Sequence, residues 1–199
     1  MSHILEALIV IAAYLIGSLS SAILLCRIAG LPDPRTEGSG NPGATNVLRF
    51  GGKRLAALVF LGDMLKGLIP VLIATLLDLP PAILAATAMA AFLGHVFPVF
   101  FGFKGGKGVA TTVGVIAGLI PLLALALLLL WLATAFLTRY SSLSAILAAL
   151  IAPFASWPLA HEPAFTIAIA VIAVILLWRH RRNISNLIAG KEPKIGKKA

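Results

Sequence analysis

Long apolar runs separated by polar connectors constrain this chain more than any other feature. The runs suitable for spanning a membrane cover residues 4–26, 55–77, 82–102, 109–138, 142–160 and 164–179. A helix needs about 20 residues to cross a hydrocarbon core of roughly 30 Å, and five of the runs fit one crossing. The run 109–138 is too long for one span and is interrupted by Gly118 and Pro121. The pattern predicts an all-α, polytopic membrane protein.

The placement of charge predicts how the runs cross. Only 12% of the residues are charged, whereas a soluble domain carries roughly a quarter. Short cytoplasmic connectors collect Lys and Arg. If 109–138 crosses twice, turning near Pro121, the basic residues of 27–54, 104–107, 139 and 179–198 fall on one side. We therefore predict one domain over residues 1–199. It is a bundle of seven transmembrane helices with short fourth and fifth helices, the N-terminus outside and the C-terminus cytoplasmic.

Several classes of function are disfavoured by the same residues. The topology and an anionic lipid or substrate account for the net charge of +9, and no nucleic-acid-binding motif occurs. Cys26 is the only cysteine, which excludes internal disulfides and cysteine-based zinc sites. The cytoplasmic carboxylates are scattered, so neither a metal site nor a cofactor is expected. No histidine is followed by aspartate at the spacing His-x-x-x-x-Asp that many acyltransferases use.

A glycine- and lysine-rich loop precedes the run 109–138 and reads Phe103-Lys104-Gly105-Gly106-Lys107-Gly108-Val109-Ala110-Thr111-Thr112. Glycines allow successive N–H groups to point toward one anion, and the helix that starts near Gly108 adds its N-terminus. The Walker A spacing is missing, so nucleotide binding is not implied. The alternative interpretation is a basic connector that only sets the orientation in the membrane.

A second polar loop lies between the first two runs and reads Gly38-Ser39-Gly40-Asn41-Pro42-Gly43-Ala44-Thr45-Asn46. Its Ser, Thr and Asn side chains are short hydrogen-bonding groups among glycines that permit tight turns. Arg49 follows as a candidate fork for a phosphate. The alternative is a solvated connector. Two such loops at a membrane surface indicate chemistry on phosphorylated lipid precursors.

The segment that follows the last run brings His180 and Asn183 three residues apart, which places them on one face if the helix continues. An interfacial anchor built from Trp178 and the arginines is the alternative. Within the second run, Asp63 and Lys66 lie one turn apart, and we expect them to pair and neutralise each other. His95 is expected to be a hydrogen-bonded structural group.

Three segments resemble the signature loops of the bacterial PlsY family, the acyl-phosphate:glycerol-3-phosphate acyltransferases. They are Gly38–Asn46, Gly94–Thr112 and Arg179–Glu192. The second reads Gly-His-x-Phe-Pro-Val-Phe-x-x-Phe-Lys-Gly-Gly-Lys-Gly-Val-Ala-Thr, which is long and specific. The resemblance implies transfer of a fatty acyl group from acyl phosphate to the first hydroxyl of glycerol 3-phosphate. It also implies a bacterial inner membrane, an active site at the cytoplasmic face, and a partner enzyme that supplies acyl phosphate.

The resemblance also assigns site residues. The catalytic set is Lys107, Ser39, Arg49, His180 and Asn183. The acyl phosphate would be cradled by Ser39, Asn41 and Thr45 and by the loop Gly105–Thr111, that is Gly105, Gly106, Lys107, Gly108, Val109, Ala110 and Thr111. Gly43, Asn46 and Lys104 are also expected to bind substrate. Glycerol 3-phosphate would be held by Arg49, Lys107, Ser142, His180 and Asn183. The family pattern places a second serine at 145, where this chain has Ala145 after Ser144, so no role is carried over to a second serine.

Two questions stay open at this point. The proton of the attacking hydroxyl is taken either by His180 or by the phosphate of the donor, and the resemblance favours the phosphate. A transporter for organic phosphates is the rival function. Against it, the basic groups gather at one face of the membrane, whereas transporters bind near the midplane.

Overall fold

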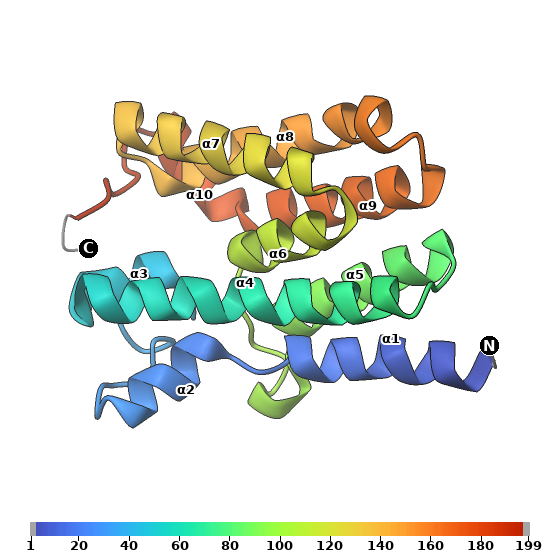
Figure 1. Cartoon of the computed structure of the whole chain (residues 1–199). Helices are drawn as coiled ribbons and strands as arrows, with labels where there is room; N and C mark the ends of the chain where they lie inside the picture. The colour runs from blue at the N-terminus through green and yellow to red at the C-terminus, as the bar shows by residue number, and fades with distance from the viewer. Residues whose placement is uncertain (1–2, 197–199) are drawn as a thin grey trace.

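The computed structural model describes residues 3–196, and this part of the chain is built from helices. The elements are α1 (His3–Gly17), α2 (Ser21–Ile28), α3 (Ala44–Phe50), α4 (Gly52–Leu76), α5 (Pro81–Val96), the 3-10 turn η1 (Val99–Phe101), α6 (Val109–Leu119), α7 (Pro121–Thr138), α8 (Ser141–Ala160), α9 (Pro163–Arg179) and α10 (Arg181–Ile188). The long helices lie side by side, and the first and last described residues lie at opposite ends of the bundle (Figure 1). The predicted all-α architecture is confirmed.

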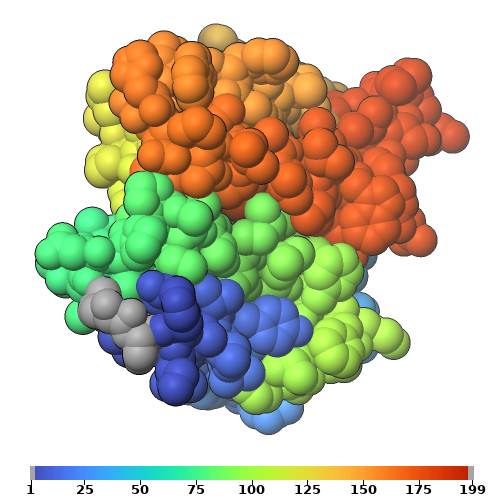
Figure 2. All heavy atoms as spheres, turned by 90° about the vertical axis from the view of Figure 1, so that its right-hand side faces the viewer, coloured from blue at the N-terminus to red at the C-terminus, as the bar shows by residue number. Residues whose placement is uncertain are grey.

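Helix α6 joins the two halves of the bundle. It packs on α4 and α5 in the N-terminal half and on α7 and α9 in the C-terminal half. Seen from the end at which α1 starts, the N-terminal helices form one half and α8 and α9 the other (Figure 2). Many large apolar side chains stand exposed around the bundle, among them Leu8, Leu65, Phe136 and Phe154. So large an apolar surface belongs in lipid.

Within residues 3–196, four helices are long and apolar enough to cross a membrane, namely α4, α5 with η1, α7 and α8. Counting the bent pairs α1–α2 and α9–α10 as single spans brings the number to six. Helix α6 has 11 residues and is therefore about 16 Å long, too short for a hydrocarbon core of roughly 30 Å. The break of 109–138 occurs at Pro121, where the sequence predicts it. The predicted short fifth helix is wrong, because α7 has 18 residues.

Two expected continuous helices are broken. The run 4–26 bends by 46° between α1 and α2, where the Ser18 hydroxyl donates to the Tyr14 carbonyl and Ser20 caps α2. The carbonyl of Leu19, freed by the break, accepts a 2.6 Å hydrogen bond from the Lys66 ammonium. The helix expected to continue through His180 also ends at Arg179, and α10 departs at 58°.

Glycines bring the N-terminal helices into close contact. A side chain at Gly17 would lie 2.2 Å from the carbonyl oxygen of Ala91, and one at Gly94 would lie 2.3 Å from that of Tyr14. Helices α1 and α5 therefore meet backbone to backbone, as small residues permit in membrane bundles. This packing fixes the end of α5, from which the glycine-rich loop starts.

Candidate active site

A cavity of about 630 Å³ opens at the end of the bundle that holds α3 and the C-terminal segment. Helices α3 and α4 form one wall, α7 and α8 another, and α10 with residues 192–195 a third. Residues 107–110, where α6 starts, also line it. Thirteen of the sequence-predicted site residues line this cavity: Ser39, Asn41, Gly43, Thr45, Asn46, Arg49, Lys107, Gly108, Val109, Ala110, Ser142, His180 and Asn183.

The start of α6 is shaped by a glycine that no other residue replaces without strain. Gly108 caps the helix with φ of 89°, in the left-handed region. A side chain there would lie 2.3 Å from the ring of Phe92. The first N–H groups of a helix have no partner within it and favour an anion. Gly108 thus directs the N-terminus of α6 toward the cavity, beside Lys107.

Four predicted residues of the second loop lie elsewhere. The backbone of Gly106 donates to the carbonyl of His95, and the Gly105 carbonyl accepts from the Arg179 guanidinium at 2.7 Å. Neither glycine lines the cavity, because both pack against the end of α5. Lys104 is exposed and does not line the cavity, and Thr111 is fully buried against α4. Of the predicted loop, residues 107–110 line the cavity, whereas residues 104–106 and Thr111 do not.

The first loop is held in shape by Asn46. Its amide donates to the carbonyls of Pro34 and Glu37 at 2.8 and 2.9 Å, and its carbonyl oxygen accepts from the Ser39 N–H at 2.8 Å. The hydroxyl of Thr45 lies 3.1 Å from that of Ser141 on α8. Asn46 therefore folds the loop onto α3, and Thr45 connects it to the opposite wall.

A chain of hydrogen bonds joins the second loop to the C-terminal segment. The Lys107 ammonium donates to Asn183 at 2.6 Å, and the Asn183 amide donates to Glu192 Oε1 at 2.7 Å. The Ser142 hydroxyl donates to the same oxygen at 2.6 Å. Glu192 is absent from the predicted site, because a carboxylate in an irregular segment carries no spacing signal. Glu192 is the last residue of the segment Arg179–Glu192, which resembles a signature loop, and this position was the sequence signal that could have identified it.

The protonation state of the His180 ring follows from its contacts. Its Nδ1 lies 2.8 Å from the Leu176 carbonyl, which only accepts, so Nδ1 carries the proton and Nε2 keeps its lone pair. His180 follows the last residue of α9 and is buried. Burial and the Lys107 charge lower the pKa of His180 to about 4. The ring is therefore neutral near pH 7, with an acceptor nitrogen available.

Lys107 is the central cation of the cavity. Burial lowers the pKa of its ammonium to about 8, and the nearby Arg49 and Arg179 add to this effect, which Glu192 opposes. The group remains a cation at neutral pH. A partly buried cation, which is less well solvated, gains more from an incoming anion than a fully exposed one does.

A buried ionic group forms part of the cavity wall, which Asp63 and His95 line. Lys66 pairs with Asp63 at 2.8 Å, which confirms the predicted i, i+3 pair. His95 Nδ1 lies 3.7 Å from the same carboxylate oxygen. A side chain at Gly106 would lie 2.3 Å from His95 Nε2, so the His95 ring packs directly against the glycine loop. These contacts agree with a structural role for His95.

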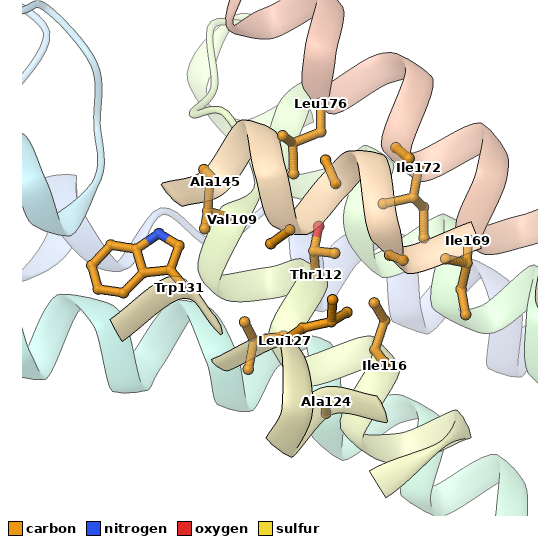
Figure 3. A pocket seen from close by; sticks show the side chains of 15 residues that line it. Val109, Thr112, Ile116, Ala124, Leu127, Trp131, Ala145, Ile169, Ile172 and Leu176 are labelled. Carbon is orange, nitrogen blue, oxygen red and sulfur yellow. The ribbon is translucent and has the colours of Figure 1, made fainter. Parts of the chain in front are cut away.

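The other side of the cavity is apolar. Phe60 of α4 and Leu128, Trp131 and Leu132 of α7 line it. A second, small hollow of about 40 Å³ lies between α6, α7, α8 and α9, and Trp131, Val109 and Ala145 line both (Figure 3). The cavity therefore has charged groups on one side and apolar side chains on the other. A ligand with a polar head and an apolar tail requires such an arrangement.

The comparison with protein families decides the assignment. The model for glycerol-3-phosphate acyltransferases matches residues 7–190. The chain belongs to this family. A glycerol-3-phosphate acyltransferase of Thioalkalivibrio sulfidiphilus (strain HL-EbGR7) is 55% identical over 195 residues, which cover 98% of this chain and 96% of the relative. One of Shewanella halifaxensis (strain HAW-EB4) is 52% identical over 195 residues, with 98% and 97% covered.

Solved structures agree with the family. The crystal structure of PlsY, an integral membrane glycerol 3-phosphate acyltransferase, in its glycerol 3-phosphate form has a TM-score of 0.91 and 41% identity over 96% of both chains. Its lysophosphatidic acid form has a TM-score of 0.89 and 40% identity over 96% of this chain and 95% of that one. The resemblance predicted from the three loops is confirmed, and this chain is a multi-pass membrane acyltransferase.

Proposed function

We propose that this protein transfers a fatty acyl group from acyl phosphate to the sn-1 hydroxyl of glycerol 3-phosphate. The acyl carbon–oxygen bond to phosphate breaks and a new ester bond forms, giving 1-acylglycerol 3-phosphate and inorganic phosphate. The observation that carries the proposal is the pairing, within one cavity, of an anion site with an apolar wall. Acyl phosphate has the matching shape.

The phosphate of the donor binds at the start of α6. The Lys107 ammonium and the free N–H groups of residues 108–110 supply positive charge, and Ser39 and Asn41 line the same cavity. The acyl tail lies along Phe60 and Leu128 toward lipid. Charge neutralisation makes phosphate a good leaving group, and the apolar surroundings strengthen each electrostatic contact.

Glycerol 3-phosphate binds between α3 and α10. Arg49 offers two parallel N–H donors to its phosphate, and Asn183 holds Lys107 in place. The neutral His180 accepts a hydrogen bond from the reacting hydroxyl through Nε2. Two substrates held side by side react as if at high effective concentration, about 10⁵ M or more.

The donor phosphate is the better base for the hydroxyl proton. His180 is a weak base because burial and Lys107 hold its pKa at about 4. A phosphate monoanion–dianion pair has a pKa of about 6 and reaches the hydroxyl without another protein group. His180 therefore orients the hydroxyl in the ground state, and the hydroxyl proton turns from Nε2 to the leaving phosphate as the new ester bond forms.

The membrane topology completes the proposal. Helix α6 counts as a seventh, incomplete crossing, which agrees with chain ends at opposite ends of the bundle (Figure 1). Arg49 and Lys53 line the cavity and Arg139 lies in the connector before α8 at the same end, whereas Asp78 and Glu162 belong to connectors at the other end. By the positive-inside rule the cavity faces the cytoplasm of a bacterial inner membrane.

A reconstituted two-substrate assay tests this function. Purified protein in detergent is given palmitoyl phosphate and radiolabelled glycerol 3-phosphate, and lysophosphatidate and phosphate are measured together. We expect equal amounts of both products, and no product when palmitoyl-CoA replaces the acyl phosphate. Product from palmitoyl-CoA alone, or none from palmitoyl phosphate, would refute the proposed donor.

A further inference from the structure

We propose that Glu192 is a positioning residue that turns Ser142 into a hydrogen-bond acceptor for the second hydroxyl of the polyol phosphate. The inference rests on the proposed function and deepens it, since it names how the site recognises its acceptor. The key contact is the 2.6 Å bond from the Ser142 hydroxyl to Glu192 Oε1. A hydroxyl has one proton and two lone pairs.

Because a carboxylate oxygen only accepts, the proton of Ser142 points to Glu192. The lone pairs of the serine oxygen are then free to accept. Glu192 Oε1 also accepts from Asn183, and Oε2 is buried without a hydrogen-bond partner among residues 3–196. In the described part of the chain, the carboxylate therefore directs its hydrogen bonding to Ser142 and Asn183.

The C-terminal segment is anchored so that it delivers this carboxylate. The Ile195 N–H donates to the Arg139 carbonyl at 2.7 Å, and the Lys194 ammonium lies over the Tyr140 ring. Both anchors lie just before α8, which carries Ser142 near its start. Glu192 itself is nearly fully buried. The segment that carries Glu192 is therefore fixed against the start of α8, where Ser142 lies.

The acceptor substrate needs hydrogen-bond acceptors as well as donors from the cavity. Lys107, Arg49 and the start of α6 suit phosphate oxygens, but glycerol 3-phosphate also brings two hydroxyl protons that need acceptors. His180 Nε2 serves the reacting hydroxyl in the proposed function. Ser142, held as an acceptor, serves the other. Without Glu192, the serine proton is free to turn toward the cavity and this recognition is lost.

An acceptor analogue isolates the contact. The compound 3-hydroxypropyl phosphate keeps the phosphate and a primary hydroxyl but lacks the second hydroxyl. Unpaired polar groups left by a missing hydroxyl weaken the transition state strongly. We expect kcat/KM for glycerol 3-phosphate to exceed that for the analogue by about tenfold or more. In Ser142→Ala and in Glu192→Ala the ratio should fall to about one to three.

Matched controls separate this role from loss of structure. Ser144→Ala removes a hydroxyl that bonds the Tyr140 carbonyl outside the cavity, and Glu37→Gln removes a carboxylate that does not line it. Both should keep the ratio of the unaltered protein. In the double variant Ser142→Ala/Glu192→Ala the ratio should equal that of Ser142→Ala, because the glutamate acts through the serine.

The kcat/KM ratios of the variants distinguish the possible outcomes. A ratio that stays high in Ser142→Ala, or that falls in Ser142→Ala but not in Glu192→Ala, overturns the inference. If Glu192→Ala does not fold, Glu192→Met takes its place, since methionine has a similar length but its thioether is only a weak acceptor for Ser142 and should lower the ratio. Absence of any transfer by the unaltered protein would refute the proposed function instead. Calorimetric binding of the two acceptors would then decide the inference.

Discussion

The fall of kcat/KM at alkaline pH, the alkaline limb of the pH profile, is the most specific prediction that the site geometry makes. Burial lowers the pKa of Lys107 to about 8, whereas an ordinary lysine titrates near 10.4. An ammonium group is charged below its pKa and neutral above it, so lowering the pKa of Lys107 brings the loss of its charge to lower pH. The cation that binds phosphate is therefore present at pH 7 and lost as the pH rises through 8.

The size of the effect follows from the titration. At pH 9 about one molecule in ten keeps the Lys107 charge, which corresponds to about 1.4 kcal/mol. Because kcat/KM reports the free enzyme, it should fall about tenfold per unit above pH 8. Initial rates with palmitoyl phosphate, corrected for hydrolysis without protein, measure this limb from pH 6 to 10.

Substitutions assign the limb to the residue. Lys107→Arg keeps a charge at every accessible pH, so the limb should disappear even though the plateau is lower. Lys107→Ala should lose about 10²- to 10³-fold in kcat/KM, since one donor to developing charge is missing. The exposed Lys104, outside the cavity, is the control, and Lys104→Ala should change kcat/KM less than about threefold. A profile flat to pH 10, or a limb that persists in Lys107→Arg, would refute the reasoning.

Three further predictions follow from other parts of the structure. Gly108→Ala should abolish most activity because it strains a left-handed backbone and meets Phe92, whereas Gly102→Ala, also left-handed but in open space, should only lower the thermal midpoint slightly. Asp63→Asn should destabilise the fold by about 3 kcal/mol or more by leaving the Lys66 charge unpaired; a thermal midpoint in detergent equal to that of the unaltered protein would contradict the buried pair. His180→Gln should raise KM for glycerol 3-phosphate and retain turnover, and a collapse of kcat at saturation would make His180 the base.

The sequence predicts the features that depend on hydropathy and local turn chemistry. The division at Pro121, the helix start after Gly108 and the Asp63–Lys66 pair are all properties of neighbouring residues. The break between α1 and α2 is missed because Leu19 keeps the run apolar. The freed Leu19 carbonyl is satisfied by Lys66, 47 residues away.

The candidate site was predictable in its chemistry and less so in its geometry. Gly105 and Gly106 carry the composition of an anion loop, yet their close contacts with His95 and Pro98 turn them toward α5. Such contacts depend on tertiary packing. Glu192 reaches Ser142 across 50 residues of sequence, and no periodic pattern marks an irregular segment.

Direct transfer between two substrates in one cavity is the central claim, and initial-rate kinetics test it most directly. Rates are measured over a grid of palmitoyl phosphate and glycerol 3-phosphate, together with phosphate release when the acceptor is omitted. The account predicts intersecting double-reciprocal lines and no burst of phosphate without glycerol 3-phosphate. Parallel lines with a stoichiometric burst would reveal an acyl-enzyme and contradict it.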